Sequence, residues 1–282
     1  MIPSSHIAHR SRWLTELIAA WGFAQRNYFL TKRYFMWELV WLAYTTVSAM
    51  SIGFIGVSAD QALGDASDQR ITTFLLIGSL LWSYLSMIFD ILSETVSWER
   101  WEGTIEYTFM SPASRATQLI GTSIYAIIYG IVRAAVIFGI ISLFFDMDLS
   151  QANYASALVV LVICSISLVG FGMVAAVMPL LSPEKGQQVT SIFTAMLLLV
   201  SGVYYSTDVL PEWMQTIAKF SPVTYALEGM RGAMLDGDGV SELWSSIWPL
   251  LIMGAVLVPA GMLIFRAGER YAKRTGLLKR SG

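Results

Sequence analysis

Three glutamates with helical spacing stand out in a chain that otherwise carries few charges. Glu99, Glu102 and Glu106 follow one another at steps of three and four residues within segment 98–112. On a short helix this spacing places the three carboxylates on one face, and Ile105 and Phe109 on another. Such a face suits docking to a partner protein, and we expect the segment to act in binding.

Residues for nucleotide, metal or covalent chemistry are scarce. No Gly-x-x-x-x-Gly-Lys-Ser/Thr loop is present to hold phosphates, and the nearest candidate, Gly-Gln-Gln at 186–188, lacks the lysine. The two histidines, His6 and His9, lie at the extreme N-terminus, away from the single cysteine, Cys164. A serine nucleophile would find no histidine base in any apolar run. We therefore expect no catalytic residue, metal site or cofactor on this chain.

One cation interrupts an apolar run. Arg133 lies near the middle of residues 116–145, where an arginine in a membrane costs roughly 2.5 to 3.5 kcal/mol on insertion scales. Two interpretations remain open. Arg133 either faces the protein interior or a dimer path and contacts an anionic substrate group or a carboxylate, or it makes an interhelical hydrogen bond to carbonyls or hydroxyls.

The elements that carry these residues are predicted to be membrane spans. The 282 residues are 55% hydrophobic and only 13% charged, against about 25% charged in typical soluble proteins. Six runs reach the roughly 20 residues that a helix needs to cross the hydrocarbon. They are residues 35–57, 71–93, 116–145, 153–178, 187–205 and 243–265. We expect one all-α integral membrane domain over residues 1–282.

The basic residues between these runs predict an orientation, because Lys and Arg near span ends stay cytoplasmic. Fourteen of the 18 Lys and Arg residues fall on the side that holds both termini, and the opposite side holds only Arg70, Lys219 and Arg231. That opposite side is acidic through Asp60, Asp65, Asp68, Asp146, Asp148, Asp236 and Asp238. We expect both termini to be cytoplasmic, as an even number of spans requires.

An amphipathic segment precedes the first span. Apolar residues such as Leu14, Leu17 and Trp21 recur at helical spacing within residues 10–33, with Arg26 and other polar residues between them. This pattern predicts an interfacial helix that lies among lipid headgroups. A short helix packed on a partner protein is the alternative.

Segment 98–112 resembles the cytoplasmic coupling segment of ABC-2 type permeases. That segment reads approximately Glu-Arg, two variable residues, Gly-Thr, an aliphatic residue, Glu, and then Ser-Pro. The matching residues here are Glu99, Arg100, Gly103, Thr104, Ile105, Glu106, Ser111 and Pro112. The resemblance implies a coupling helix, with Glu102 included, that fits a groove on a separate ATPase subunit.

A second match follows the fifth run, and the resemblance covers nearly the whole chain. The matching residues include Tyr204, Tyr205, Pro211, Phe220, Pro222, Tyr225 and Arg231. In related permeases this segment, here residues 206–240, dips back toward the membrane as a re-entrant helical hairpin and closes the outer gate. Separately, Ser221 followed by Pro222 is a typical helix start, and Asp208 with Pro211 is similar, so two short helices are predicted. An ordinary surface loop is the alternative.

The resemblance implies a permease subunit of an ATP-driven exporter in the cytoplasmic (inner) membrane. We expect an ABC ATPase partner that carries ATP and Mg²⁺, a second permease copy or paralogue, membrane lipid as surroundings and no nucleic acid. The expected substrate is a hydrophobic or amphipathic compound, and a polysaccharide or glycolipid is the alternative. An ion-coupled secondary transporter needs several buried ionisable groups at the midplane, and only Arg133 fits that need.

Overall fold

The computed structural model describes residues 12–63, 69–110, 113–147, 149–182 and 185–276, and every regular element within them is a helix. The long helices are α1 (Arg12–Arg33), α2 (Phe35–Ala62), α3 (Arg70–Trp101), α5 (Arg115–Ile141), α6 (Tyr154–Ala175) and α11 (Trp244–Thr275). The shorter ones are α4 (Ile105–Met110), α7 (Val177–Leu181), α8 (Gly186–Val200), α9 (Glu212–Ala218) and α10 (Pro222–Arg231), with the 3-10 turn η1 (Thr207–Val209) and the π-helical turn η2 (Gly232–Asp236). Several residues named above lie outside the described ranges: His6, His9, Asp65, Asp68, Ser111, Pro112 and Asp148.

Within the described residues, five helical segments are long and apolar enough to cross a membrane, one fewer than predicted. They are α2, α3, α5, α6 continued through α7, and α11. The predicted span at residues 187–205 forms α8, which has only 15 residues. At 1.5 Å per residue α8 reaches about 22 Å, short of the roughly 30 Å of hydrocarbon. It ends early because Gly202 adopts a left-handed conformation with φ of 73°, which breaks the helical path.

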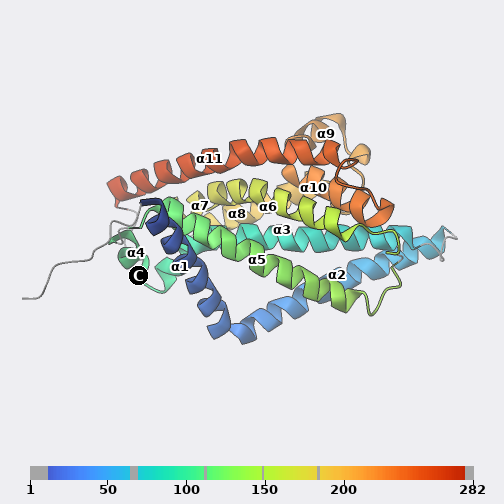
Figure 1. The fold of residues 1–282 in the computed structure, drawn as a ribbon, viewed down its shortest axis with the longest axis horizontal. Helices are drawn as coiled ribbons and strands as arrows, with labels where there is room; N and C mark the ends of the chain where they lie inside the picture. Colours follow the sequence, from blue (N-terminus) through green and yellow to red (C-terminus); the bar gives the residue numbers. More distant parts are fainter. Residues whose placement is uncertain (1–11, 64–68, 111–112, 148, 183–184, 277–282) are drawn as a thin grey trace, which may run out of the picture.

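The long helices lie alongside one another and define two ends of the molecule (Figure 1). The start of α1, α4 and the end of α11 lie at one end, on the left of the view, and α9, α10 and the start of α11 lie at the other. We call these the α4 end and the α9 end. Helix α8 contacts α7 on one side and α9 on the other, so it links the two ends despite its length.

Helix α6 forms the centre of the core and packs against α3, α10 and α11. The contact with α11 is close because both helices place glycines there. A Cβ on Gly170 would stand 2.5 Å from the backbone of Leu257, and one on Gly261 would stand 2.6 Å from the carbonyl oxygen of Gly170. Large apolar side chains remain exposed on the outer helices, including Met36, Trp37 and Ile55 of α2. An apolar exterior of this kind suits a protein surrounded by lipid.

Asp60 has a different environment from the one we expected. The sequence suggested an acidic surface residue, whereas the structure buries Asp60 at the end of α2 with 2% of its surface exposed. Its carboxylate accepts hydrogen bonds from the backbone N–H groups of Ile71 and Thr72, at 3.1 and 3.0 Å, and from the Thr72 hydroxyl at 2.6 Å. The first N–H groups of a helix have no intrahelical partner, so Asp60 caps α3 from the preceding helix.

Helix α1 packs its small residues against α5. Ala20 and Ala24 are buried, and Gly121 of α5 lies so close that a Cβ there would stand 2.2 Å from the carbonyl oxygen of Ala20. The large apolar residues face away from the bundle and are exposed: Leu14, Leu17, Ile18, Trp21, Tyr28 and Phe29. The amphipathic pattern of the sequence therefore separates a small-residue contact face from an exposed apolar face.

Candidate functional site

The predicted coupling segment forms a tight turn at the α4 end. Helix α3 ends at Trp101, Gly103 adopts a left-handed conformation with φ of 71°, and α4 begins at Ile105. The Thr104 N–H donates to the Glu99 carbonyl at 2.9 Å, which closes the end of α3. Glycine at this position has no Cβ to clash, so the chain can reverse there without strain. The predicted short helix is present, but it covers only the second half of the segment.

Glu99 is the buried centre of a polar cluster that joins four helices. Its residue surface is 3% exposed, and its Oε1 accepts from Arg26 Nη1 of α1 at 2.8 Å, from Gln118 Nε2 of α5 at 2.7 Å and from Thr108 Oγ1 of α4 at 3.2 Å. We call these four residues the Glu99 cluster. Paired with an arginine and two neutral donors, the carboxylate is satisfied inside the protein.

This arrangement differs from the one predicted for the three glutamates. Glu99 lies in α3, Glu102 lies in the turn and Glu106 lies in α4, so the three residues do not follow one another along a single helix. Glu99 points into the protein, and Glu102 is half-buried. Arg26 and Gln118 were not among the predicted site residues. The only hint of Arg26 in the sequence was its place on the polar side of the amphipathic segment.

Helix α4 presents two exposed apolar side chains. Tyr107 is 77% exposed and Met110 is 83% exposed, although α4 lies at the end of the bundle and not along its apolar sides. The two residues lie three positions apart on α4, so they share one face of this helix. Tyr107 and Met110 were not singled out from the sequence, which directed attention to the carboxylates.

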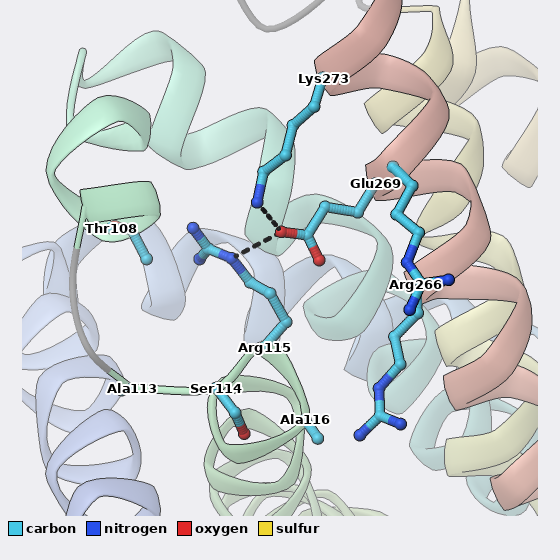
Figure 2. Close-up of a pocket in the computed structure, with 9 residues that line it drawn as sticks. Thr108, Ala113, Ser114, Arg115, Ala116, Arg266, Glu269 and Lys273 are labelled. Carbon is cyan, nitrogen blue, oxygen red and sulfur yellow. Dashed lines mark ion pairs between the residues drawn. The ribbon is translucent and has the colours of Figure 1, made fainter.

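A basic cavity of about 330 Å³ lies beside α4 (Figure 2). The Glu269 carboxylate of α11 pairs with Arg115 Nε at 3.6 Å and with Lys273 Nζ at 2.7 Å, as the dashed lines show. Arg266 and Arg270 also line this cavity. The Arg115 pair ties the start of α5 to the end of α11, whereas the Lys273 pair lies within α11. Four cations against one carboxylate leave the cavity positively charged.

At the α9 end, Arg231 holds the loop that follows α8. Its guanidinium donates to the carbonyls of Gly202 at 3.0 Å and Val203 at 2.7 Å, and lies 3.5 Å from the ring centroid of Phe74. Burial lowers the pKa of Arg231 to about 10, with Glu228 opposing the shift, so the group stays cationic at neutral pH. Gly78 of α3 makes room for the loop, because a Cβ there would stand 2.1 Å from the Val203 carbonyl oxygen.

The other predicted gate residues lie in or near two short helices, α9 and α10. Two short helices were predicted in this segment. Pro211 precedes α9, and Pro222 is buried at the first turn of α10. The Tyr225 hydroxyl donates to the Lys219 carbonyl at 3.0 Å, and the Tyr205 hydroxyl donates to the Leu199 carbonyl. Tyr204 is half-buried, and Phe220 is 74% exposed. Of the predicted set, Arg231 joins α10 to α3 and to the loop after α8, while Phe220 is largely exposed.

Arg133 contacts α2 and α3 from α5. Its Nη2 donates to Thr45 Oγ1 at 3.2 Å, and its Nη1 lies 3.9 Å from Glu38 Oε2 and 3.7 Å from Met87 Sδ. Glu38 also accepts a hydrogen bond from the Tyr129 hydroxyl at 2.6 Å. The arginine side chain is 13% exposed. Arg133 therefore has a carboxylate and a hydroxyl as interhelical partners within this chain.

Comparisons with known proteins place the chain among transport proteins. The family model for the ABC-2 type transporter matches residues 20–235. The chain is 26% identical over 182 residues to "Probable multidrug ABC transporter permease YbhR" of Escherichia coli strain K12, covering 62% of this chain and 47% of that protein. It is 28% identical over 119 residues to "Linearmycin resistance permease protein LnrN" of Bacillus subtilis strain 168, covering 42% of this chain and 31% of that protein. The chain thus spans less than half the length of each of these relatives.

Proposed function

The chain belongs to the ABC-2 type transporter family, and from this premise we propose that it is the permease subunit of an ATP-driven exporter. Its helices carry the substrate path, and a separate ABC ATPase supplies the energy. These 282 residues contain no phosphate-binding loop, and the proposal places ATP and Mg²⁺ on the partner.

The Glu99 cluster is the single observation that best supports this proposal. Glu99 lies on α3 and accepts hydrogen bonds from α1, α4 and α5. A movement of α4, on which a partner would act, is therefore passed to three further helices through one buried carboxylate. Two discrete arrangements of such a network would let nucleotide binding outside the membrane change the substrate path inside it.

We assign the ATPase contact to the turn and helix at residues 98–112. Tyr107 and Met110 offer exposed apolar contacts there, and the half-buried Glu102 lies in the turn before α4. Arg100, Gly103, Thr104, Ile105 and Glu106 complete the coupling segment that the family resemblance implies. Glu99 holds the segment in place from behind and does not itself form the contact.

The charge distribution supports a cytoplasmic α4 end. Arg115, Arg266, Arg270 and Lys273 gather there, and Lys and Arg near span ends favour the cytoplasmic side. On this orientation both termini are cytoplasmic, α1 lies at the membrane interface with its apolar face in lipid, and α9 and α10 form the outer gate. The protein then resides in the cytoplasmic membrane, and a second permease copy or a paralogue completes the path.

We propose a hydrophobic or amphipathic substrate. Two relatives whose names refer to multidrug transport and linearmycin resistance favour this class over the alternative, a polysaccharide or glycolipid. Stimulation of ATP hydrolysis in the reconstituted complex by a lipophilic drug, and not by a glycolipid, would support it.

The decisive test is purification of the tagged chain from its native cells in mild detergent, followed by mass spectrometry of bound proteins and an assay of ATP hydrolysis. We expect an ABC ATPase to co-purify with the wild type and to be lost from Tyr107→Ala and Met110→Ala. Tyr271→Ala is the matched control, because Tyr271 is an exposed tyrosine of α11 near the same end. Transport by the purified chain under an ion gradient without ATP would overturn the proposal.

A further inference from the structure

A second cavity, of about 520 Å³, opens at the α9 end and is rich in carboxylates. Its walls come from α3, η1, α10, η2 and the start of α11, and its size falls in the usual range for small-molecule sites. Five acidic residues line it: Asp208, Glu228, Asp236, Asp238 and Glu242. Arg231 is the only Lys or Arg among the described residues that line it.

Arg231 is held by backbone carbonyl groups and offsets the charge of only one of the five acidic residues. Its two terminal nitrogens donate to the carbonyls of Gly202 and Val203, and its guanidinium lies over the Phe74 ring. Asp236 pairs with Arg70 at 3.2 Å, but both side chains are more than half exposed, so water screens that pair. The cavity therefore keeps a net negative charge beside the apolar surfaces of Phe74, Leu227 and Leu243.

A buried hydroxyl gives independent evidence of a ligand site. Thr224 lines the cavity and is 6% exposed, yet its Oγ1 has no hydrogen-bond partner among the described residues. Leaving a buried hydroxyl without a partner is costly, so such groups are normally satisfied by protein, water or ligand. Thr224 lies one helical turn before Glu228 on α10, and Glu228 lines the same cavity.

The carboxylates are spread too widely for a metal ion. Within the described residues, no group of three or more His, Cys, Asp or Glu side chains is placed to share a metal. A dispersed negative lining next to apolar walls suits a larger cation whose charge lies on an organic framework.

We propose that this cavity binds an amphipathic organic cation that carries N–H groups, with Glu228 and Asp208 facing its charge and the Thr224 hydroxyl accepting from one N–H. The inference deepens the proposed function, on which it rests, by naming the charge class of the exported compound.

The test is equilibrium binding of rhodamine 123, followed by fluorescence polarisation, to the purified chain in the uncharged detergent dodecyl maltoside. Fluorescein is the matched probe, because it has the same xanthene ring system with negative charge. We expect rhodamine 123 to bind and fluorescein not to bind. Glu228→Gln and Asp208→Asn should each weaken rhodamine binding by roughly tenfold, the usual effect of losing a charge-assisted contact.

Two controls separate charge and hydroxyl effects from general damage. Asp146→Asn removes an exposed carboxylate outside the cavity and should bind like the wild type. Thr224→Val should weaken binding, while Thr224→Ser, which keeps the hydroxyl, should restore it. Added phosphatidylethanolamine then distinguishes the source of the amine: competition assigns the lipid headgroup as an occupant of the site, and no competition assigns the free compound.

Equal binding of rhodamine 123 by the wild type, Glu228→Gln and Asp208→Asn would overturn the inference, as would equal binding of fluorescein. The assay needs neither ATPase nor nucleotide, so its outcome is separate from that of the proposed function. Loss of ATPase co-purification with intact cation binding would reject the exporter and keep the site. An intact ATPase complex together with rhodamine binding that is insensitive to the cavity variants would keep the exporter and reject the site.

Discussion

At the scale of single residues, buried charges in this protein join helices to one another. Glu99 is surrounded by donors from three other helices, with Arg26 at 2.8 Å. An ionised carboxylate is tolerated in such surroundings only when it is paired and hydrogen-bonded, so each member of the cluster depends on the others.

Replacing Glu99 with Gln keeps the size of the side chain and removes its charge. We expect the thermal midpoint in detergent to fall, with a loss of about 1.5 to 3 kcal/mol, the usual contribution of a hydrogen bond to a charged group. Glu102→Gln, half-buried in the adjacent turn, is the control and should change the midpoint little. Equal midpoints for the two variants would show that the cluster does not hold the α4 end together.

Arg133 and Glu38 provide a second residue-scale prediction. Arg133→Leu leaves the Glu38 carboxylate without its nearby cation, and we expect about 1 to 3 kcal/mol of destabilisation from the unpaired charge. The double variant Arg133→Leu with Glu38→Gln removes both charges and should recover most of that stability. Thermal unfolding of the three proteins measures the effect. If the double variant unfolds like the single one, the pair is not coupled and Arg133 acts in another way, such as contact with substrate.

At the scale of elements, close contacts between backbone segments decide where helices end and how they cross. Helix α8 ends at Val200, and the loop that follows is held between Arg231 of α10 and Gly78 of α3. The α6–α11 and α1–α5 contacts likewise depend on glycines at the crossing points. Small residues at helix contacts let backbones approach, which increases packing where lipid supplies no hydrophobic driving force between helices.

Gly78→Ala tests the contact between α3 and the loop. The added methyl group would stand 2.1 Å from the Val203 carbonyl oxygen, which is backbone and cannot move aside freely, so we expect about 1 to 3 kcal/mol of destabilisation. Gly139→Ala is the matched control, because a Cβ there meets nothing within 4 Å, and alanine favours a helix by about 1 kcal/mol. Thermal midpoints measured side by side should therefore move in opposite directions, and a shared direction would contradict this account.

At the scale of the whole molecule, charge is distributed unequally between the two ends. The basic cavity beside α4 contrasts with the acidic cavity near α9. This asymmetry is the physical basis of the proposed orientation, since it matches the preference of Lys and Arg for the cytoplasmic side.

Cysteine labelling in intact cells tests that orientation. In a Cys164→Ala background, Asp146→Cys in the loop after α5 should react with a membrane-impermeant maleimide. Thr275→Cys at the end of α11 should react only after the cells are permeabilised. Native Cys164 is fully buried, so the parent chain should remain unlabelled as a control. The opposite labelling pattern would place the α4 end outside the cell.

Much of the architecture was predictable because hydropathy acts over whole segments. The helical class and the two short helices before α11 are confirmed, and five of the six predicted spans fall on described helices that are long and apolar enough to cross a membrane. The length of the remaining run, residues 187–205, was overestimated. Its residues 201–205 are apolar enough to continue a span, and hydropathy contains no information on the left-handed turn at Gly202. The partners of Glu99 were not predictable, because Arg26 and Gln118 lie 73 and 19 residues away from it along the chain.

By itself, the sequence determined that this chain is a helical membrane protein, how its charges divide along the chain, and which family it belongs to, because composition and local motifs are properties of consecutive residues. The tertiary structure decided which charges face inward. Glu99 became the buried centre of a four-helix cluster, Asp60 became the cap of α3, and five separated carboxylates came to line one cavity. Such pairings depend on how helices cross. The crossings are set by small residues and packing distances, which a hydropathy pattern does not reveal.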